Sequence, residues 1–563
     1  MEKRIIECVP NFSEGRDHHI IEEIANTIKS TPGVSLLNVD PGEATNRTVI
    51  TFVGEPDSVV EAAFKSVKRA GELIDMSKHH GAHPRIGATD VLPLIPVSGI
   101  TLEECAELAR GLARRIADEL LIPCYCYEAA AFSEERRNLA VCRSGEYEGI
   151  AKKLSTPGRE PDFGSRPMDE RIAHTGCTVV GARDFLIAVN FNLNSTSTRR
   201  ANAIAFDVRE KGRPVREGNP ITGTPVRDSS GNIVMQPGTL KKTKAIGWYI
   251  DEYGIAQVSM NITDINVTPL HKAFDEVCRC AGNRGLRVTG TEIVGLVPKR
   301  ALVEAGRYFL EKQHRSTGIP ESDIIRIAVR SMGLDDLRPF DVRGKVIEYL
   351  LEDSSKKPQL ADLTVKSFAE ETSRESPAPG GGTVSAYMGA LGAALGTMVA
   401  NLSSHKAGWD DRWDTFSRYA DEGQAIMREL LHLVDEDTAA FNRIMSAFGM
   451  PKGNDAEKAA RTEAIKSATH YAAEVPLQTM KTSMRIFALC RAMVEEGNPN
   501  SISDAGVGAL AARAAVLGAG LNVKINATSL KDKEEAKRLV GEADALMSEA
   551  NEQEKEIMSR IKF

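Results

Sequence analysis

The sequence changes character near residue 353, and this change constrains the fold more than any other feature. Before it, β-branched runs such as residues 47–54 (RTVITFVG) alternate with apolar helical stripes such as residues 55–75. After it, strand signals stop. The polar, proline-containing segment 351–360 (LEDSSKKPQL) is typical of a linker. We therefore expect a mixed α/β part followed by an all-α part of about 200 residues.

Five helices are expected after the linker, with predicted bounds 384–402, 412–448, 456–495, 503–521 and 533–561. Before it, residues 179–193 are interpreted as a strand that opens a second α/β layer. Residues 155–176, rich in Pro, Gly and Arg, are predicted to form a long loop, and residues 212–238 a surface insertion. The predicted units are 1–180 and 181–352 (both α/β), a linker at 353–361, and a helical domain at 362–563.

Composition narrows the class of protein. The chain of 563 residues is 42% hydrophobic and 26% charged and has no tract of 18 apolar residues, so we expect no membrane association. A net charge of −7 gives no support to nucleic-acid binding. The nine cysteines lack zinc-type spacing, and the N-terminus has no secretory signal. These features predict a reduced, cytoplasmic protein without a metal.

Residues 79–97 (HHGAHPRIGATDVLPLIPV) are the first candidate site. Three histidines precede a rigid turn and an apolar, strand-like run. His83 is the strongest candidate for a catalytic base, because Pro84 restricts its backbone and Arg85 could hold an anionic ligand beside it. The alternative is that these are surface histidines on a connecting loop.

A second candidate site begins at the glycine run of SPAPGGGTVSAY. Gly380, Gly381 and Gly382 precede a helix, where exposed N–H groups and the helix dipole favour an anion or a polar ring. The run lacks the lysine of a P-loop. Simple helix packing, through small residues further along the same helix, is the alternative.

Asp437 is the other candidate in the helical part. It occupies a position on an apolar stripe between Val434 and Phe441, where a carboxylate is costly unless it is paired or used. Burial would raise its pKa towards a proton-transfer role. Asp435 and Glu436 lie off the stripe and are interpreted as solvated charges. A structural hydrogen bond from Asp437 is the alternative.

Many separated segments resemble the formiminotransferase-cyclodeaminase family. They include ECVPNFSEGR, NVDPGEATNRTVITFVG, HHGAHPRIGATDVLPLIPV, EYEGIAKKL, GARDFLIAVNFNL, LKKTKAIGWY, SPAPGGGTVSA and VDEDTAAF, in the family's order. The resemblance implies two α/β transferase subdomains and a helical deaminase. It also implies two reactions: transfer of the formimino group from N-formimino-L-glutamate to tetrahydrofolate, and cyclisation of the product to 5,10-methenyltetrahydrofolate with release of ammonia.

The resemblance also assigns residues. His83 matches the transferase active-site histidine, and Asp437 matches the cyclodeaminase aspartate. The family's folate-binding stretch falls between Gly164 and Gly176, and its candidate contacts are Gly164, Ser165, Arg166, Pro167, Thr175 and Gly176. This chain departs from the family there, because SRPMDERIAHT is longer and more charged than the usual segment. A homo-oligomer built from dimers in a ring is implied as well.

The chemistry suggests roles for further residues. A neutral imidazole suits His83 as the base for the attacking folate nitrogen, Asp40 in the NVDPG turn could orient it, and Arg47 or Arg85 could bind the donor's carboxylates. Lys241, Lys242 and Lys244 could dock a polyglutamylated folate tail or could form a solvated strand edge. Two alternative functions remain: a formyl- or formiminotransferase fused to a methenyltetrahydrofolate cyclohydrolase-like domain, and a folate-binding scaffold without catalysis.

Overall fold

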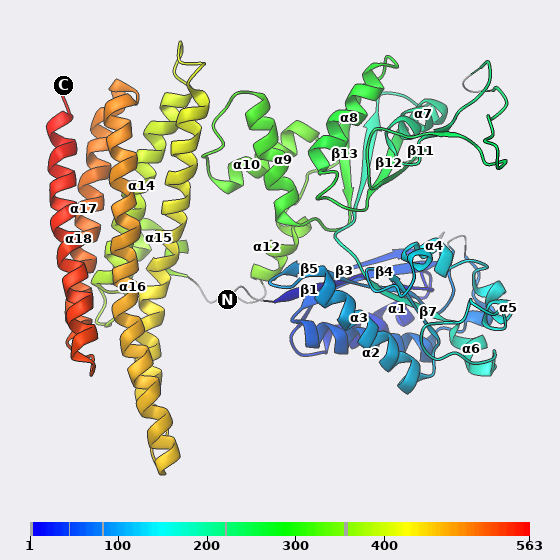
Figure 1. Ribbon diagram of the computed structural model, residues 1–563, viewed down its shortest axis with the longest axis horizontal. Coiled ribbons are helices and arrows are strands. Elements are labelled where there is room, and N and C mark those ends of the chain that lie inside the picture. The colour runs from blue at the N-terminus through cyan, green and yellow to red at the C-terminus, as the bar shows by residue number, and fades with distance from the viewer. Residues whose placement is uncertain (1–3, 44–45, 82–83, 220–221, 354–358, 563) are drawn as a thin grey trace. The chain divides into compact units, whose positions relative to one another are not determined.

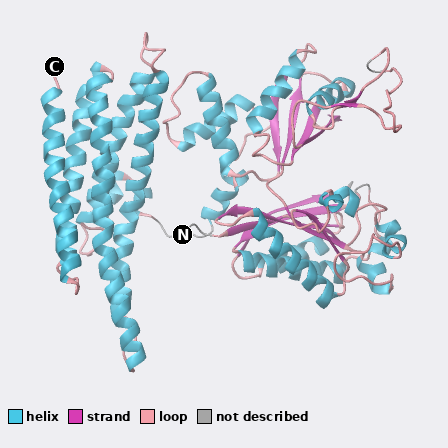
Figure 2. Ribbon diagram, viewed as in Figure 1, coloured by secondary structure: helices cyan, strands magenta, loops and turns pink. Residues whose placement is uncertain are grey.

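The computed structural model of the chain describes residues 4–43, 46–81, 84–219, 222–353 and 359–562. They form two compact units: Met1–Leu302 with Met332–Ser355, and Val303–Ser331 with Lys356–Phe563. The first unit contains the sheets and the second is helical (Figure 2). The predicted fold class, α/β layers followed by an all-α region, is confirmed.

A seven-stranded mixed sheet forms the N-terminal part of the first unit (Figure 1). Its order is β1-β4-β2-β5-β7-β6, with β3 beside β4. The β5, β7 and β6 strands are parallel and the other pairings are antiparallel. The strands are β1 (Ile5–Cys8), β2 (Asn11–Phe12), β3 (Val34–Gly42), β4 (Arg47–Gly54), β5 (Thr89–Ser98), β6 (Cys124–Glu128) and β7 (Thr178–Ala182).

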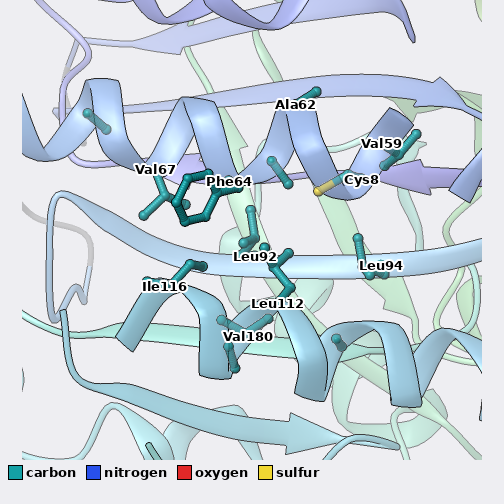
Figure 3. Close-up of a cluster of buried hydrophobic side chains, with 14 of the residues drawn as sticks. Cys8, Val59, Ala62, Phe64, Val67, Leu92, Leu94, Leu112, Ile116 and Val180 are labelled. Atoms are coloured by element: carbon teal, nitrogen blue, oxygen red, sulfur yellow. The ribbon is translucent and has the colours of Figure 1, made fainter. Parts of the chain in front are cut away.

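One face of this sheet is apolar and covered by helices. Because successive strand residues point to opposite faces, Ile6 and Cys8 enter the core while Glu7 points to the other side. The covering helices are α1 (His18–Lys29), α2 (Pro56–Leu73) and α3 (Leu102–Arg115). Figure 3 shows Phe64 and Val67 of α2 packed over Leu92 of β5. The predicted helix at 55–75 and strand at 47–54 are confirmed.

The opposite face carries a second cluster beneath three short helices, α4 (Leu139–Cys142), α5 (Ile150–Leu154) and α6 (Glu170–Thr175). Tyr125 and Tyr127 of β6 point into this cluster. The prediction of an unbroken loop over 155–176 is therefore wrong at its end. The Asp169 side chain accepts from the backbone N–H of Ile172 and starts α6 there.

A four-stranded antiparallel sheet follows, in the order β11-β12-β8-β13. Its strands are β8 (Ile187–Leu193), β11 (Thr243–Ile250), β12 (Ile255–Ile262) and β13 (Val288–Val294), and its helices are α7 (Thr198–Val208) and α8 (Leu270–Gly282). The predicted single strand at 179–193 is wrong, because the chain leaves the first sheet after β7 and enters the second at β8.

The insertion at 212–238 is largely exposed, as predicted, and contains the small ribbon of β9 (Arg213–Pro214) and β10 (Met235–Gln236). Further along, α11 (Val342–Lys345) and α12 (Ile347–Asp353) end the first unit.

Long helices build the second unit: α14 (Gly381–Ser404), α15 (Trp413–Phe448), α16 (Asp455–Glu496), α17 (Ile502–Ala527) and α18 (Lys533–Arg560), preceded by the short α13 (Val365–Thr372). All five predicted helices are confirmed, with ends that differ by a few residues. Gly392 of α14 lies against the backbone of Gly508 in α17, and Gly396 lies against Leu489 in α16. These small residues therefore serve close helix packing.

Residues 303–331, from α9 (Lys299–Lys312) and α10 (Glu321–Met332), also belong to the helical unit. The backbone N–H of Thr317 donates to Ser417 Oγ at 3.0 Å, and Arg307 pairs with Asp421 at 3.0 Å. This segment therefore packs on α15 although it precedes the linker in sequence.

Two helices among the described residues, Gly381–Ser404 and Pro499–Ala527, are long and apolar enough to cross a membrane by length and composition alone. The apolar window of the first is 61% buried within the bundle and that of the second 50%. Helices at the core of a bundle meet the same criterion, so this feature is weak evidence for a membrane span.

Candidate functional site

The helical unit brings the predicted glycine run and Asp437 together. Gly380 is the N-cap residue of α14, and Gly381 and Gly382 begin its first turn. A Cβ atom at Gly382 would lie 2.2 Å from Oδ1 of Asp437, so glycine leaves the space that the carboxylate occupies. The Thr383 hydroxyl donates a hydrogen bond of 2.8 Å to Oδ2 of Asp437. The carboxylate thus lies at the N-terminus of a helix, where the dipole favours an anion.

Two opposing influences act on Asp437, which is half-buried on α15. Burial raises the pKa of its carboxyl above the ordinary value of 3.8, and this is the larger effect. Hydrogen bonds from the hydroxyl and backbone N–H of Thr383 act in the opposite direction. A carboxyl with a raised pKa can hold and deliver a proton closer to neutral pH. Gly381 is exposed, so the site opens to solvent.

Thr383 and Asn522 were not assigned a role from the sequence. Asn522 lies on α17, and its side-chain amide would be 3.2 Å from a Cβ atom at Gly381. Its Nδ2 donates to the carbonyl of Gly518 at 2.9 Å. The sequence signal for Asn522 is a polar amide within a Gly- and Ala-rich helix. The signal for Thr383 is its position directly after the glycine run.

Asp435 and Glu436 are not the solvated charges that the helical stripe predicts. Asp435 accepts a 2.6 Å hydrogen bond from the backbone N–H of Leu360. Glu436 accepts from the Tyr471 hydroxyl at 2.6 Å and from Arg443 at 2.7 Å. Both carboxylates have structural partners, and Asp437 is the one at the glycine run.

The histidine loop is described only in part, since His83 lies outside the described residues. His79 is buried, and its Nδ1 accepts a hydrogen bond of 3.2 Å from Nε of Arg85. Its Nε2–H then donates to the carbonyl of Asn46 at 3.0 Å. Burial lowers the pKa of His79. This imidazole is therefore a neutral group held by the fold.

Arg85 is also held by the protein. Its guanidinium forms a two-point pair with Glu148, at 3.0 and 2.7 Å, and donates to the carbonyl of His79 at 3.2 Å. A buried guanidinium with these partners has few donors left for a substrate carboxylate. The geometry favours Arg47 over Arg85 as an anchor for the donor.

Asp40 lies inside β3, paired with Val49 of β4, and not in the turn that the sequence suggested. Its side chain is exposed and contributes to the electrostatic environment of Arg47. Whether Asp40 orients His83 stays a prediction, since the histidine is outside the described residues.

A polar cluster that the sequence did not single out lies around Arg47. Nε of Arg47 donates to Asn11 Oδ1 at 2.6 Å. Asp90 is fully buried, accepts from the backbone N–H of Ile86 at 3.0 Å and pairs with Arg143. Burial raises the pKa of Asp90, and Arg143 opposes that shift. The signal was an aspartate at the start of an otherwise apolar strand.

The predicted folate-binding stretch is fastened to the first sheet. Gly176 has φ +68°, and a side chain there would collide with the Ile86 carbonyl. The Thr175 carbonyl accepts from the backbone N–H of Ala88 at 2.8 Å. Thr175 also lines a cavity of about 630 Å³ together with Phe64 of α2.

The other residues predicted in this stretch lie before α6. Gly164 has φ +72°, and Ser165 and Pro167 are exposed. Arg166 donates to the Leu121 carbonyl at 3.0 Å and pairs with Asp169 at 3.0 Å. These contacts hold the segment in place without assigning it a ligand.

Lys242 and Lys244 line a cleft of about 660 Å³ within the first unit, where Glu128 and Arg183 also lie. Lys241 is exposed and is not among the lining residues of that cleft. Lys244 lies on β11, at the edge of the second sheet. The cleft and the strand edge are both present, and the two interpretations of these lysines stay predictions.

Among the described residues, no group of three or more His, Cys, Asp or Glu side chains is arranged to hold a metal ion. Both candidate sites consist of hydrogen-bonding and ionisable groups.

Comparison with known proteins matches three consecutive ranges of the chain. Family models match residues 5–183 (formiminotransferase domain, N-terminal subdomain), 188–352 (formiminotransferase domain) and 364–545 (formiminotransferase-cyclodeaminase). A mouse protein named formimidoyltransferase-cyclodeaminase is 40% identical over 550 residues, 98% of this chain and 97% of the relative.

Single-function relatives match each half. A glutamate formimidoyltransferase of Streptococcus pyogenes is 40% identical over 308 residues, 55% of this chain and 94% of the relative. A methenyltetrahydrofolate cyclohydrolase of Methylorubrum extorquens is 35% identical over 199 residues, 35% of this chain and 96% of the relative. With three family models in order and a relative matched along nearly its whole length, the chain belongs to the formiminotransferase-cyclodeaminase family.

Proposed function

We propose that the chain is a bifunctional folate enzyme of histidine degradation. It transfers the formimino group from N-formimino-L-glutamate to tetrahydrofolate and then cyclises 5-formiminotetrahydrofolate to 5,10-methenyltetrahydrofolate with loss of ammonia. The observation that carries the proposal is the 40% identity to a bifunctional relative across 98% of the chain. The proximity of Asp437 to the start of α14 supports this region as the site of the second reaction.

In the first reaction, N5 of tetrahydrofolate attacks the formimino carbon and loses a proton, and the bond from that carbon to the glutamate nitrogen then breaks. His83 accepts the proton as the general base and returns it to the glutamate nitrogen as that bond breaks. Positioned groups of this kind supply about 10²- to 10⁴-fold in rate. Arg47, which retains donors beyond those to Asn11, binds a carboxylate of the donor.

In the second reaction, N10 attacks the same carbon and the bond to the remaining nitrogen breaks. That nitrogen carries one hydrogen and needs two more to leave as ammonia: the one that N10 loses on ring closure and one further proton. Asp437 supplies it, because burial raises the pKa of this carboxyl and places its proton closer to neutral pH. The exposed N–H groups at the start of α14 hold the carbonyl side of the pterin ring.

A cyclohydrolase-like second half is the alternative, and the Methylorubrum relative is the observation that favours it. The transferase half, which precedes the helical half in the sequence, favours deamination over hydrolysis. Its product carries a formimino group, and this group yields ammonia on cyclisation. A formyl donor combined with a cyclohydrolase would release no ammonia.

Finer features belong to the same proposal. The folate carries a polyglutamate tail, supported by the cleft at Lys242 and Lys244. A tethered tail would keep the intermediate near the second site through a raised effective concentration. No resident metal takes part. A cytoplasmic location is supported by the lack of disulfides among the described cysteines.

We also propose a homo-oligomer of dimers closed into a ring. It is supported by apolar side chains that the bundle leaves exposed on α14 and α17, such as Leu391, Leu521 and Ile525. Contiguous exposed apolar patches are typical of protein interfaces. Sedimentation or mass photometry of the full chain tests it, and a monomer at micromolar concentration would contradict it.

The central test is a coupled assay with formiminoglutamate and tetrahydrofolate that follows methenyl-folate absorbance and ammonia together. Equal amounts of both products support the bifunctional enzyme. Glutamate without ammonia leaves a transferase with a different second half. Neither product means that the donor is wrong. His83→Ala should abolish glutamate release, and an unchanged rate in a folded variant would remove its assignment as base.

A further inference from the structure

A cavity of about 370 Å³ lies beneath α4 and α5, on the sheet face opposite the main core, and it belongs to neither candidate site. Tyr125 of β6 forms its floor, and the residues that matter for its chemistry are Glu135, Arg136, Cys142, Lys153 and Arg159. Its volume lies within the range of small-molecule pockets.

Lys153 is the unusual member of this cavity. The residue is 8% exposed, and its ammonium donates to the carbonyl of Cys142 and lies 4.2 Å from the Tyr125 ring centroid. An ammonium has three N–H donors, so this carbonyl uses one of them. Among the described residues, no carboxylate forms an ion pair with it. Burying a cation without an anionic partner is costly, and burial accordingly lowers the pKa of Lys153.

The other charged side chains at the cavity do not neutralise the Lys153 ammonium. Arg136 is already neutralised by Asp162, at 2.6 Å, and also donates to the Glu160 carbonyl at 2.7 Å. Arg159 is exposed and adds a second positive charge at the opening. Glu135 is exposed and solvated. The interior therefore carries a buried positive charge with unused donors.

The two thiols near Lys153 cannot supply a negative charge. Burial raises the pKa of Cys142 to about 11 and that of Cys177 to about 12, so both are neutral at physiological pH. The Tyr125 hydroxyl donates to the Arg159 carbonyl and is likewise uncharged, since burial raises its pKa.

We propose that this cavity binds a small oxyanion, a carboxylate or phosphate group, whose oxygens pair with the Lys153 ammonium. The charges of Lys153 and of Arg159 at the opening favour an anion over a neutral or cationic ligand. The anion supplies the missing negative charge, and its oxygens accept charge-assisted hydrogen bonds from the remaining N–H groups of Lys153.

The protonation of Lys153 determines how the affinity for the anion depends on pH. The anion pairs with the protonated amine, whose pKa is lowered in the free protein by burial and by Arg136 and Arg159. Affinity is therefore full at pH values below that lowered pKa and falls as the pH rises through it. Sulfate is the suitable probe, because its own charge does not change over this range.

Isothermal titration of the full chain with sulfate tests the proposal. Saturable binding is expected with a dissociation constant on the order of 1 mM. Lys153→Met should weaken it by about tenfold or more, while Lys153→Arg retains part of it. The matched control is Lys152→Met, which removes the same charge from the exposed neighbouring residue and should leave binding unchanged.

A second measurement needs no variant. Amine acylation followed by mass spectrometry should show Lys153 protected by sulfate and Lys152 unprotected. Parallel titrations with inorganic phosphate and glutarate identify whether the phosphate or the carboxylate form of the ligand fits better. The proposal is overturned if none of the three anions protects Lys153, or if Lys152→Met and Lys153→Met lower the affinity equally.

Discussion

Replacing Gly382 by alanine tests the geometry of the second site without changing any charge. The new Cβ would lie 2.2 Å from Oδ1 and 2.7 Å from Cγ of Asp437, whereas ordinary contact begins at 3.4 Å. The carboxylate must therefore move by about 1 Å. Displacement of a reacting group by about 1 Å costs roughly 10²-fold in rate. We expect Gly382→Ala to lower cyclodeaminase kcat by about that factor.

The neighbouring glycines provide matched controls. A Cβ at Gly380 meets only the Pro377 carbonyl, at 3.5 Å, and one at Gly381 approaches the end of the Asn522 side chain at 3.2 Å. None of the three glycines has a positive φ, so alanine introduces no backbone strain. Activity should therefore decrease in the order Gly380→Ala, Gly381→Ala, Gly382→Ala.

Stability should not follow the same order. Alanine is favoured over glycine inside a helix by up to about 1 kcal/mol. A displaced Asp437 loses its hydrogen bond to Thr383, which costs a similar amount. The Tm of Gly382→Ala is therefore expected to stay within a few degrees of the parent.

The assay follows methenyl-folate formation from preformed 5-formiminotetrahydrofolate, with glutamate release measured separately. The transferase rate of all three variants should be unchanged. If Gly382→Ala retains the parental cyclodeaminase rate while folded, the carboxylate beside the glycine run is not the group that acts. An equal loss in Gly380→Ala would point to the helix N-terminus itself.

Three further predictions concern single carboxylates and a lysine. Because burial raises the pKa of Asp437, its contribution to stability is fully present below the ordinary value of 3.8 and is lost as pH rises through the raised value. Asp437→Asn should therefore raise Tm at neutral pH, with a difference that shrinks towards acid pH, and should abolish cyclisation but not transfer; a lower Tm throughout would contradict this. Glu148→Ala should destabilise the first unit by about 1–2 kcal/mol in urea unfolding, because it strands buried Arg85, whereas Glu146→Ala, whose contact is 3.5 Å, should cost less than about 0.5 kcal/mol. Lys242→Ala should raise KM several-fold for a polyglutamylated folate and leave KM for the monoglutamate unchanged, and equal effects on both would favour a strand-edge role.

The sequence pattern predicts the helices of the helical unit well, because apolar and small residues there recur at helical spacing and no strand signal competes with them. The bounds of α16 differ from the predicted ones by one residue at each end. Small residues along α14 also indicated close packing, which Gly392 against Gly508 bears out. The sequence pattern is less informative where a long apolar run could form either one strand or two. The run at 179–193 is apolar throughout, so its pattern could not show that β7 and β8 belong to different sheets.

The same distinction applies to the candidate sites: local pattern identifies some of their residues, whereas pairing between distant segments decides the role of others. Asp437 was found because its stripe is regular, so a charge on it is conspicuous. Arg85 was assigned to a ligand, yet it faces Glu148, more than sixty positions away along the chain. No local pattern encodes that pairing. The stripe pattern predicts a solvated Glu436 for the same reason, because its partner Tyr471 comes from a different helix.

Lys153 differs from Arg85 and Glu436, because none of the described carboxylates pairs with it. In the sequence, Lys152 and Lys153 are indistinguishable members of a short helical segment. The fold exposes one and buries the other beside an aromatic ring. The role of a buried charge depends on its surroundings. Arg85 pairs with the carboxylate of Glu148, whereas no carboxylate among the described residues pairs with Lys153. A buried ammonium that has no counter-charge in the described part of the chain calls for an anion from solution, and the sulfate titration of Lys153 tests for that anion.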